Sequence, residues 1–192
     1  MTEKNDFETV IYCVESFLKE KNTRNKLNHI LEKGSNDWEK WLQIELEYYM
    51  EHVQGYIARR EHRAIPDNRQ LSGKSHMFVD LIFRKKMSRK DRFIYLELKC
   101  SKRGSTLLRG MSKDITKIDS IRNSYFEVSG VKRRSFWCVG FYQKCDEKSA
   151  ERLGTKIKKE GYSRVHHKAL NLCSCRGKNH KDTCRKIGLV IL

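Results

Sequence analysis

The chain has 192 residues, of which 38% are hydrophobic, which is enough for a single domain with one core. Lys and Arg outnumber Asp and Glu by 41 to 24, so the formal net charge is +17. No apolar run approaches the roughly 20 residues of a membrane-spanning helix, and the N-terminus lacks the apolar segment of a signal peptide. The sequence therefore predicts a cytoplasmic protein without a membrane partner.

The positive charge is concentrated after the first quarter of the chain. Residues 1–54 carry 7 basic and 11 acidic side chains, whereas residues 55–192 carry 34 basic and 13 acidic ones. A field of this sign and size attracts polyanions, so nucleic acid is the expected partner. A solvated basic surface or an acidic protein partner is the alternative interpretation.

Hydrophobic periodicity and turn residues predict an element order of α-α-α-β-β-β-α-β-α-β-β. The predicted helices cover residues 6–20, 24–33, 36–53, 105–125 and 146–161, and the predicted strands cover 55–65, 76–84, 92–100, 135–143, 163–172 and 186–192. This order indicates an α/β fold with a mixed central sheet flanked by helices.

Three parts of this fold are predicted along the chain. A helical extension (1–35) precedes a core (36–162), and the C-terminal strands (163–192) enclose a loop rich in Cys and His and either share the core's domain or form a small appendage. At the start of the core, Asn36 and Glu39 have the spacing of a helix capping box.

Three ionisable residues interrupt two otherwise apolar strands. Asp80 lies within the strand at 76–84, and Glu97 and Lys99 lie within the strand at 92–100. Ionised groups are rarely buried without a partner. A symmetrical hairpin register pairs Asp80 with Glu97 and Ile82 with Tyr95, and it places Lys99 on the same face as the two acids.

Two carboxylates at this separation can bind Mg²⁺ or Mn²⁺, and a neighbouring lysine can hold an attacking water. Together these groups form the apparatus of metal-assisted phosphodiester hydrolysis. A buried Asp–Lys–Glu ion cluster without a ligand is the alternative. In this register Val79, Leu81 and Phe83 face the other side of the sheet, and a slip of one residue would turn Asp80 away from Glu97.

The sequence Glu97-Leu98-Lys99, which follows Asp80 after a hairpin, resembles the motif of the PD-(D/E)XK nuclease superfamily, whose members share the restriction-endonuclease-like fold. The α-β-β-β-α-β core of that family corresponds in order to residues 36–142, about half of the chain. The resemblance implies that Asp80, Glu97 and the Leu98 carbonyl bind Mg²⁺ and that Lys99 is catalytic. Val79 stands where the family motif has a proline.

Members of this family also use residues from the flanking helices. Glu45 lies in the apolar stripe of the helix at 36–53 and is the predicted further metal or water ligand, the alternative being a structural pair with a core base. In the helix at 105–125, which follows the strand at 92–100, Lys117 is predicted to lie near the scissile phosphate. Its alternative is a surface pair with Asp114.

Other basic and polar residues are predicted to contact the nucleic-acid backbone, although each could equally be a solvated side chain. They are Ser101, Lys102, Arg103, Arg89, Lys90, Lys132, Arg133 and Arg134.

The cysteines suggest a second metal site. Their number, seven, is odd and the chain has no predicted signal peptide, so a disulfide framework is not expected. Cys173, Cys175, His180 and Cys184 have the spacing Cys-x-Cys-x4-His-x3-Cys, one residue shorter than a zinc knuckle. Three thiolates and an imidazole can complete a tetrahedral Zn²⁺ site, whereas unconnected thiols are the alternative.

These observations favour a Mg²⁺-dependent nuclease, and the resemblance makes double-stranded DNA the expected substrate. A noncatalytic nucleic-acid-binding module and a ribonuclease are the two alternatives. A homodimer would suit cleavage of both strands of a duplex, and the N-terminal helices are the candidate dimer interface.

Overall fold

A computed structural model describes residues 2–34, 38–64, 77–119, 131–173, 175 and 184–192. Within these ranges, the five helices and six strands follow one another in the predicted order. The helices are α1 (Glu3–Lys19), α2 (Lys21–Glu32), α3 (Glu39–His52), α4 (Gly104–Asp119) and α5 (Glu147–Glu160). The strands are β1 (Tyr56–Ala64), β2 (Met77–Lys85), β3 (Arg92–Ser101), β4 (Lys132–Tyr142), β5 (His166–Asn171) and β6 (Lys186–Ile191).

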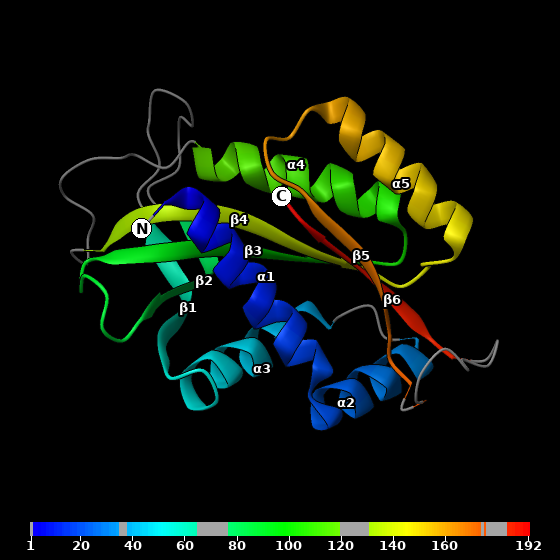
Figure 1. The fold of residues 1–192 in the computed structure, drawn as a ribbon, viewed down its shortest axis with the longest axis horizontal. Helices are drawn as coiled ribbons and strands as arrows, with labels where there is room; N and C mark the ends of the chain where they lie inside the picture. The colour runs from blue at the N-terminus through cyan, green and yellow to red at the C-terminus, as the bar shows by residue number, and fades with distance from the viewer. Residues whose placement is uncertain (1, 35–37, 65–76, 120–130, 174, 176–183) are drawn as a thin grey trace.

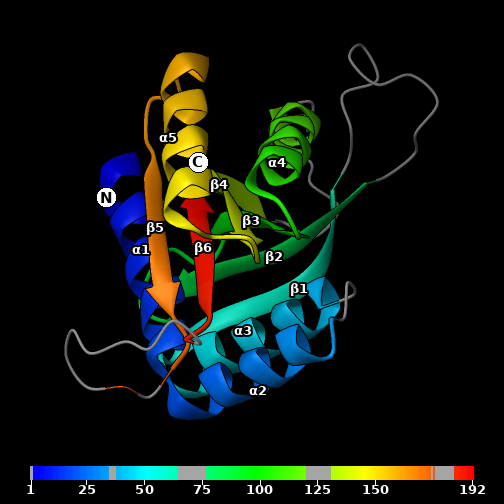
Figure 2. The same ribbon diagram turned by 90° about the vertical axis from the view of Figure 1, so that its right-hand side faces the viewer.

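The six strands form one mixed sheet in the order β1-β2-β3-β4-β6-β5 (Figures 1 and 2). β3 and β4 are parallel, and α4 lies between them in the sequence, as a connection between parallel strands requires. The other neighbouring strands are antiparallel. This arrangement confirms the predicted α/β class and mixed sheet. β5 and β6 extend the same sheet, so the C-terminal strands are not an appendage.

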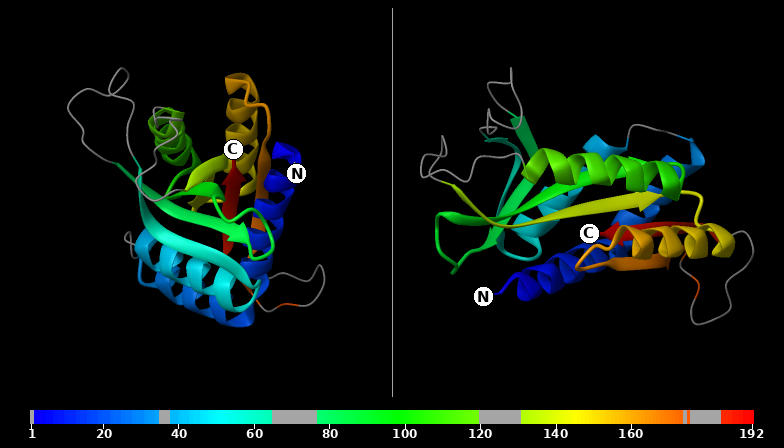
Figure 3. Two further views of the ribbon diagram at one scale, coloured as in Figure 1. Left: turned by 90° about the vertical axis from the view of Figure 1, so that its left-hand side faces the viewer. Right: turned by 90° about the horizontal axis from the view of Figure 1, so that it is seen from above.

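Helices cover both faces of the sheet (Figure 3). On one face, α1, α2 and α3 contribute Phe17, Leu27 and Leu42 to a large apolar core with the inward side chains of the sheet. On the other face, α4 and α5 pack through residues that include Leu108 and Leu153. None of the helices in the described part of the chain is long and apolar enough to cross a membrane.

A buried ion pair fixes α1 to the sheet. Asp6, only 1% exposed, pairs with Arg134 of β4 and accepts a hydrogen bond from the Ser135 hydroxyl at 2.9 Å. The neighbouring Phe7 packs on Trp137 with ring centroids 4.7 Å apart. The first helix therefore packs on the main core of the sheet.

Replacing Asp6 with alanine is expected to destabilise the protein by about 3–5 kcal/mol, since it leaves the Arg134 charge buried without its carboxylate. The free energy of unfolding, from urea denaturation followed by circular dichroism, measures this loss. Glu8→Ala is the matched control because Glu8 lies on the exposed face of the same helix, 4.0 Å from Lys4. Equal effects of the two substitutions would contradict the assignment of Asp6 as the anchor of α1.

Candidate active site

β2 and β3 form the predicted antiparallel hairpin in the predicted register. Ile82 lies opposite Tyr95, and the same register leads to Asp80 opposite Glu97. The ladder of paired backbone positions ends one residue before that last pair. The two acids therefore stand where the hairpin begins to open.

β2 is irregular at Asp80. The ladder between β1 and β2 skips Glu61 and Asp80, and Glu61 has a φ of +50°, in the left-handed region that residues with side chains rarely adopt. Leu81 belongs to the core under α1–α3, whereas Val79 packs with Ile118 on the α4 side. The prediction that Val79 and Leu81 share a face is wrong, because regular alternation does not continue through a strand irregularity.

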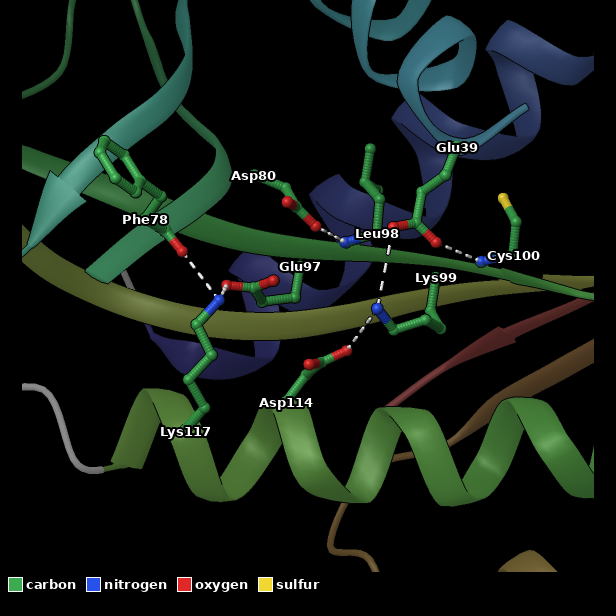
Figure 4. A network of polar contacts seen from close by, with 9 residues as sticks. All are labelled: Glu39, Phe78, Asp80, Glu97, Leu98, Lys99, Cys100, Asp114 and Lys117. Carbon is green, nitrogen blue, oxygen red and sulfur yellow. Dashed lines mark hydrogen bonds and ion pairs between the residues drawn. The ribbon is translucent and has the colours of Figure 1, made fainter. Parts of the chain in front are cut away.

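Beyond the paired ladder, carboxylates bind the edge of β3 that faces β2 (Figure 4). The Leu98 N–H donates to Asp80 Oδ2 at 2.8 Å, and the Cys100 N–H donates to Glu39 Oε2 at 2.9 Å. The N–H and C=O of one strand residue point to the same edge, so the Leu98 carbonyl also faces Asp80. Oxygen atoms from two strands and one helix are thus gathered at this opening.

Glu97 is almost completely buried, with 2% of its surface exposed. Its Oε1 accepts a hydrogen bond at 2.7 Å from Lys117 of α4, whose ammonium also donates to the Phe78 carbonyl at 2.8 Å. Burial, followed by the charge of Asp80, raises the pKa of Glu97 to about 8 despite the opposing effect of Lys117. Without a metal, this carboxyl is therefore largely protonated at neutral pH.

Lys99 lies between two further acids. Its Nζ is 3.3 Å from Asp114 Oδ2 on α4 and 3.7 Å from Glu39 Oε1 on α3. Burial by itself would lower the pKa of Lys99, but Glu39 and Asp114 outweigh it and raise that pKa above its usual value. Gly110 lets α4 approach, since a Cβ there would lie 3.3 Å from Lys99 Cγ. Lys99 is consequently a fixed cation at neutral pH.

The pKa of Glu39 reflects the same crowding. Burial raises it first of all, and the charges of Asp80 and Asp114 add to this effect. The hydrogen bond from the Cys100 N–H and the charge of Lys99 act in the opposite direction. Four carboxyls and two ammonium groups therefore share this small volume, and their charges are strongly interdependent.

The structure brings together most of the residues predicted for the catalytic centre. They are Asp80, Glu97, Leu98, Lys99 and Lys117. Glu45 is not among them, because it pairs at 2.7 Å with Lys26 of α2, in contact with solvent. The structure does not bring Glu45 to the cluster as a metal or water ligand; Glu45 pairs with a base, as the alternative has it, but Lys26 is exposed and not part of the core.

Two members of the cluster were not predicted. Glu39 was interpreted as half of a capping box, but α3 begins after Trp38 without a side-chain cap hydrogen bond, and the Glu39 carboxylate reaches β3 instead. A signal existed, since Glu39 lies one turn before the buried Leu42 on the same helix face. Asp114, which the alternative interpretation pairs with Lys117 at the surface, pairs with Lys99 instead.

The residues predicted to contact nucleic acid differ in their exposure to solvent and in the partners that they already have. Lys102, Arg103, Arg89 and Lys90 are exposed, and Ser101 is half-buried at the end of β3. Lys132 pairs with Asp91 at 3.6 Å, and Arg133 donates to the Ile118 carbonyl at 2.8 Å. Arg134 is wrong as a contact residue, because its charge is used in the buried pair with Asp6.

A second cluster joins the ends of the β5–β6 connection. The sulfur atoms of Cys173, Cys175 and Cys184 all lie within 4.8 Å of one another, so these residues could hold a metal ion such as zinc. Among the described residues, no other group of three Cys, His, Asp or Glu side chains meets this spacing. The predicted fourth ligand, His180, lies outside the described residues.

Two arginines connect this cysteine cluster to α2. Arg24 of α2 donates to the Cys173 carbonyl at 3.2 Å, and Arg185 donates to the Asn28 carbonyl at 3.0 Å. Leu172 and Arg185 are also joined by a backbone hydrogen bond of 2.9 Å. A metal ion held by the cysteines would therefore fasten the β5–β6 connection to the helical layer.

No protein-family model matches this chain, and neither a curated protein nor a solved structure matches it significantly. The functional argument below consequently depends on the geometry of the carboxylate–lysine cluster and on the charge of the chain.

The raised pKa of Glu97 predicts a specific pH dependence of stability. The folded pKa lies above that of an unfolded glutamate, so the folded state binds more protons and its stability falls as pH rises between about 5 and 8. Relative to Glu97→Gln, the metal-free wild type should lose at most about 1.4 kcal/mol per pH unit in this window. Urea denaturation at several pH values measures the difference. A pH-independent difference would contradict the raised pKa, and Glu45→Gln should behave like wild type.

Metal analysis of the purified protein tests the cysteine cluster. Wild type is expected to retain about one zinc per chain, whereas Cys173→Ala and Cys184→Ala should lose most of it and melt at a lower temperature, because a structural zinc ion stabilises the folded chain. Cys13→Ala, in the buried face of α1, is the control and should keep its zinc. Full zinc content in both cluster variants would exclude these cysteines as ligands.

Proposed function

We propose that this protein is a metal-dependent nuclease that hydrolyses phosphodiester bonds, with double-stranded DNA as its substrate. One observation carries the proposal: the carboxyls of Asp80 and Glu97 are held side by side at the open edge of β3, with the ammonium of Lys99 beside them. Two adjacent carboxyls require either a proton or a cation. In the metal-free protein a proton reduces the repulsion between the two carboxyls. A bound divalent cation would reduce it in the same way.

The finer fold assignment belongs to this proposal. Residues 36–142 are expected to form a restriction-endonuclease-like core, and α3-β1-β2-β3-α4-β4 follow the element order of that core. The parallel pair β3 and β4, joined through α4, lies at the centre of the sheet. In this proposal Asp80, Glu97 and Lys99 have the roles that the resemblance of the sequence implies.

The donor set suits Mg²⁺ or Mn²⁺. Asp80, Glu97 and the carbonyl of Leu98 offer hard oxygen ligands from two neighbouring strands, as these ions prefer. When bound, such an ion supplies Lewis-acid stabilisation of the negative charge that develops on the phosphate. Binding requires Glu97 to ionise, so Lys117 has a supporting role: its ammonium already favours the charged carboxylate.

Lys99 acts as a hydrogen-bond donor rather than as a base. Glu39 and Asp114 raise its pKa, so at neutral pH its Nζ carries a proton that it can donate to the attacking water or to a phosphate oxygen. The same two acids hold the ammonium from opposite sides of the sheet. In this proposal they are positioning residues, since they act through Lys99.

Cleavage of supercoiled plasmid with Mg²⁺ or Mn²⁺ tests the proposal. Wild type should nick or linearise the plasmid, EDTA should stop the reaction, and Asp80→Asn, Glu97→Gln and Lys99→Met should each lower the rate at least about 100-fold. Glu45→Gln is the matched control and should cut at the wild-type rate, because Glu45 pairs with Lys26 outside the cluster.

The outcomes separate the three candidate activities. Cleavage of RNA but not of DNA would replace the proposal with a ribonuclease that uses the same residues. Binding of nucleic acid without cleavage of either, by wild type with both metals, would favour a noncatalytic module. In that case the acids and lysines would form a structural ion cluster.

A further inference from the structure

Away from the carboxylate–lysine cluster, a basic pocket lies between the first turn of α4 and α5. Figure 1 shows these two helices. The volume of the pocket is about 300 Å³. The side chains that line it are Arg103, Ser105, Lys144, Ser149, Arg152, Leu153 and Lys156, together with the backbone at Gly104. Four of these residues are cations and none is an acid.

No acid lines the pocket beside these four cations. Arg103, Lys144, Arg152 and Lys156 are all exposed, and none of them makes an ion pair within the part of the chain that the structure describes. Asp146, on which the charge of Arg152 acts, caps α5 by accepting from the Ser149 N–H at 2.9 Å and the Ser149 hydroxyl at 2.7 Å. Four like charges around one cavity repel one another unless an anion enters.

The backbone adds to this attraction. Gly104 is the first residue of α4, where the amide groups of the first turn have no carbonyl partner within the helix and the helix dipole is positive. The absence of a side chain at Gly104 lets the two helices meet, because a Cβ there would lie 2.7 Å from Leu153 Cδ2. The hydroxyl of Ser105 offers one further donor at the rim.

We infer that this pocket binds a phosphate group of the nucleic-acid strand whose cleavage is proposed above. The inference rests on that proposed function for its partner and adds Lys144, Arg152 and Lys156 to the contacts. Ten residues of α4 separate Gly104 from Asp114, which corresponds to about 15 Å along the helix axis. At a rise of about 3.4 Å per nucleotide, the bound phosphate would lie about four nucleotides from the scissile bond.

Fluorescence anisotropy of a labelled DNA duplex, measured in EDTA so that no cleavage occurs, tests the inference. Arg103→Gln, Arg152→Gln and Lys156→Gln should each weaken binding about three- to tenfold at 0.1 M salt and reduce the slope of log K against log salt by about 0.9. Lys158→Gln is the matched control, since Lys158 faces the other side of α5 and does not line the pocket. It should change affinity less than twofold.

Two results would overturn the inference. If Lys158→Gln weakens binding as much as Lys156→Gln, the pocket contributes only to a general positive field. If the three pocket variants bind DNA like wild type while inorganic phosphate still shifts the amide resonances of Gly104 and Ser105, the pocket binds small phosphate ions and not the nucleic acid. Failure of the nuclease proposal would give a different result from failure of this inference. In that case wild type would bind DNA through the pocket but would not cut it.

Discussion

The close approach of two buried carboxyls, Asp80 and Glu97, is the constraint on which the rest of the centre depends. Each of the two carboxyls has a hydrogen-bond donor beside it. The Leu98 N–H donates to Asp80, and the Lys117 ammonium donates to Glu97. The raised pKa of Glu97 shows that these partners do not fully replace solvent. The protein thus keeps several charged groups close together within a well-packed sheet.

Much of this arrangement was predictable because strands obey simple rules. Alternation of side chains and a symmetrical hairpin were enough to place Ile82 opposite Tyr95 and to bring Asp80 to Glu97. The element order was equally accessible, since hydrophobic periodicity and turn residues such as Gly34 and Gly161 indicate where helices and strands lie. The face of Val79 was predicted wrongly because side-chain alternation is interrupted at Asp80. Such an interruption of the backbone cannot be recognised from the amino-acid composition.

The helical contribution was harder to predict for a physical reason. The apolar stripe of α3 that contains Glu45 only partly coincides with the face that meets the core, since Tyr48 is 59% exposed and Gln43 is buried. The stripe also does not say where along the helix the open edge of β3 passes. The place where α3 passes the edge of β3 depends on the tertiary structure. It brings Glu39, in the first turn of the helix, to β3, whereas Glu45, in the middle of the helix, pairs with Lys26. Asp114 and Lys99 are related in the same way, since their pairing depends on how α4 lies across the sheet.

The ion pair between Asp6 and Arg134 has a consequence for synthesis of the chain. Its partners are 128 residues apart, so α1 leaves the ribosome long before β4 exists. At a translation rate of about 5–20 residues per second, roughly 6–26 seconds pass between synthesis of α1 and synthesis of its partner strand β4. During this interval the helix is a target for chaperones or for other nascent chains. The ion pair that fixes α1 to the sheet forms only after β4 has been made.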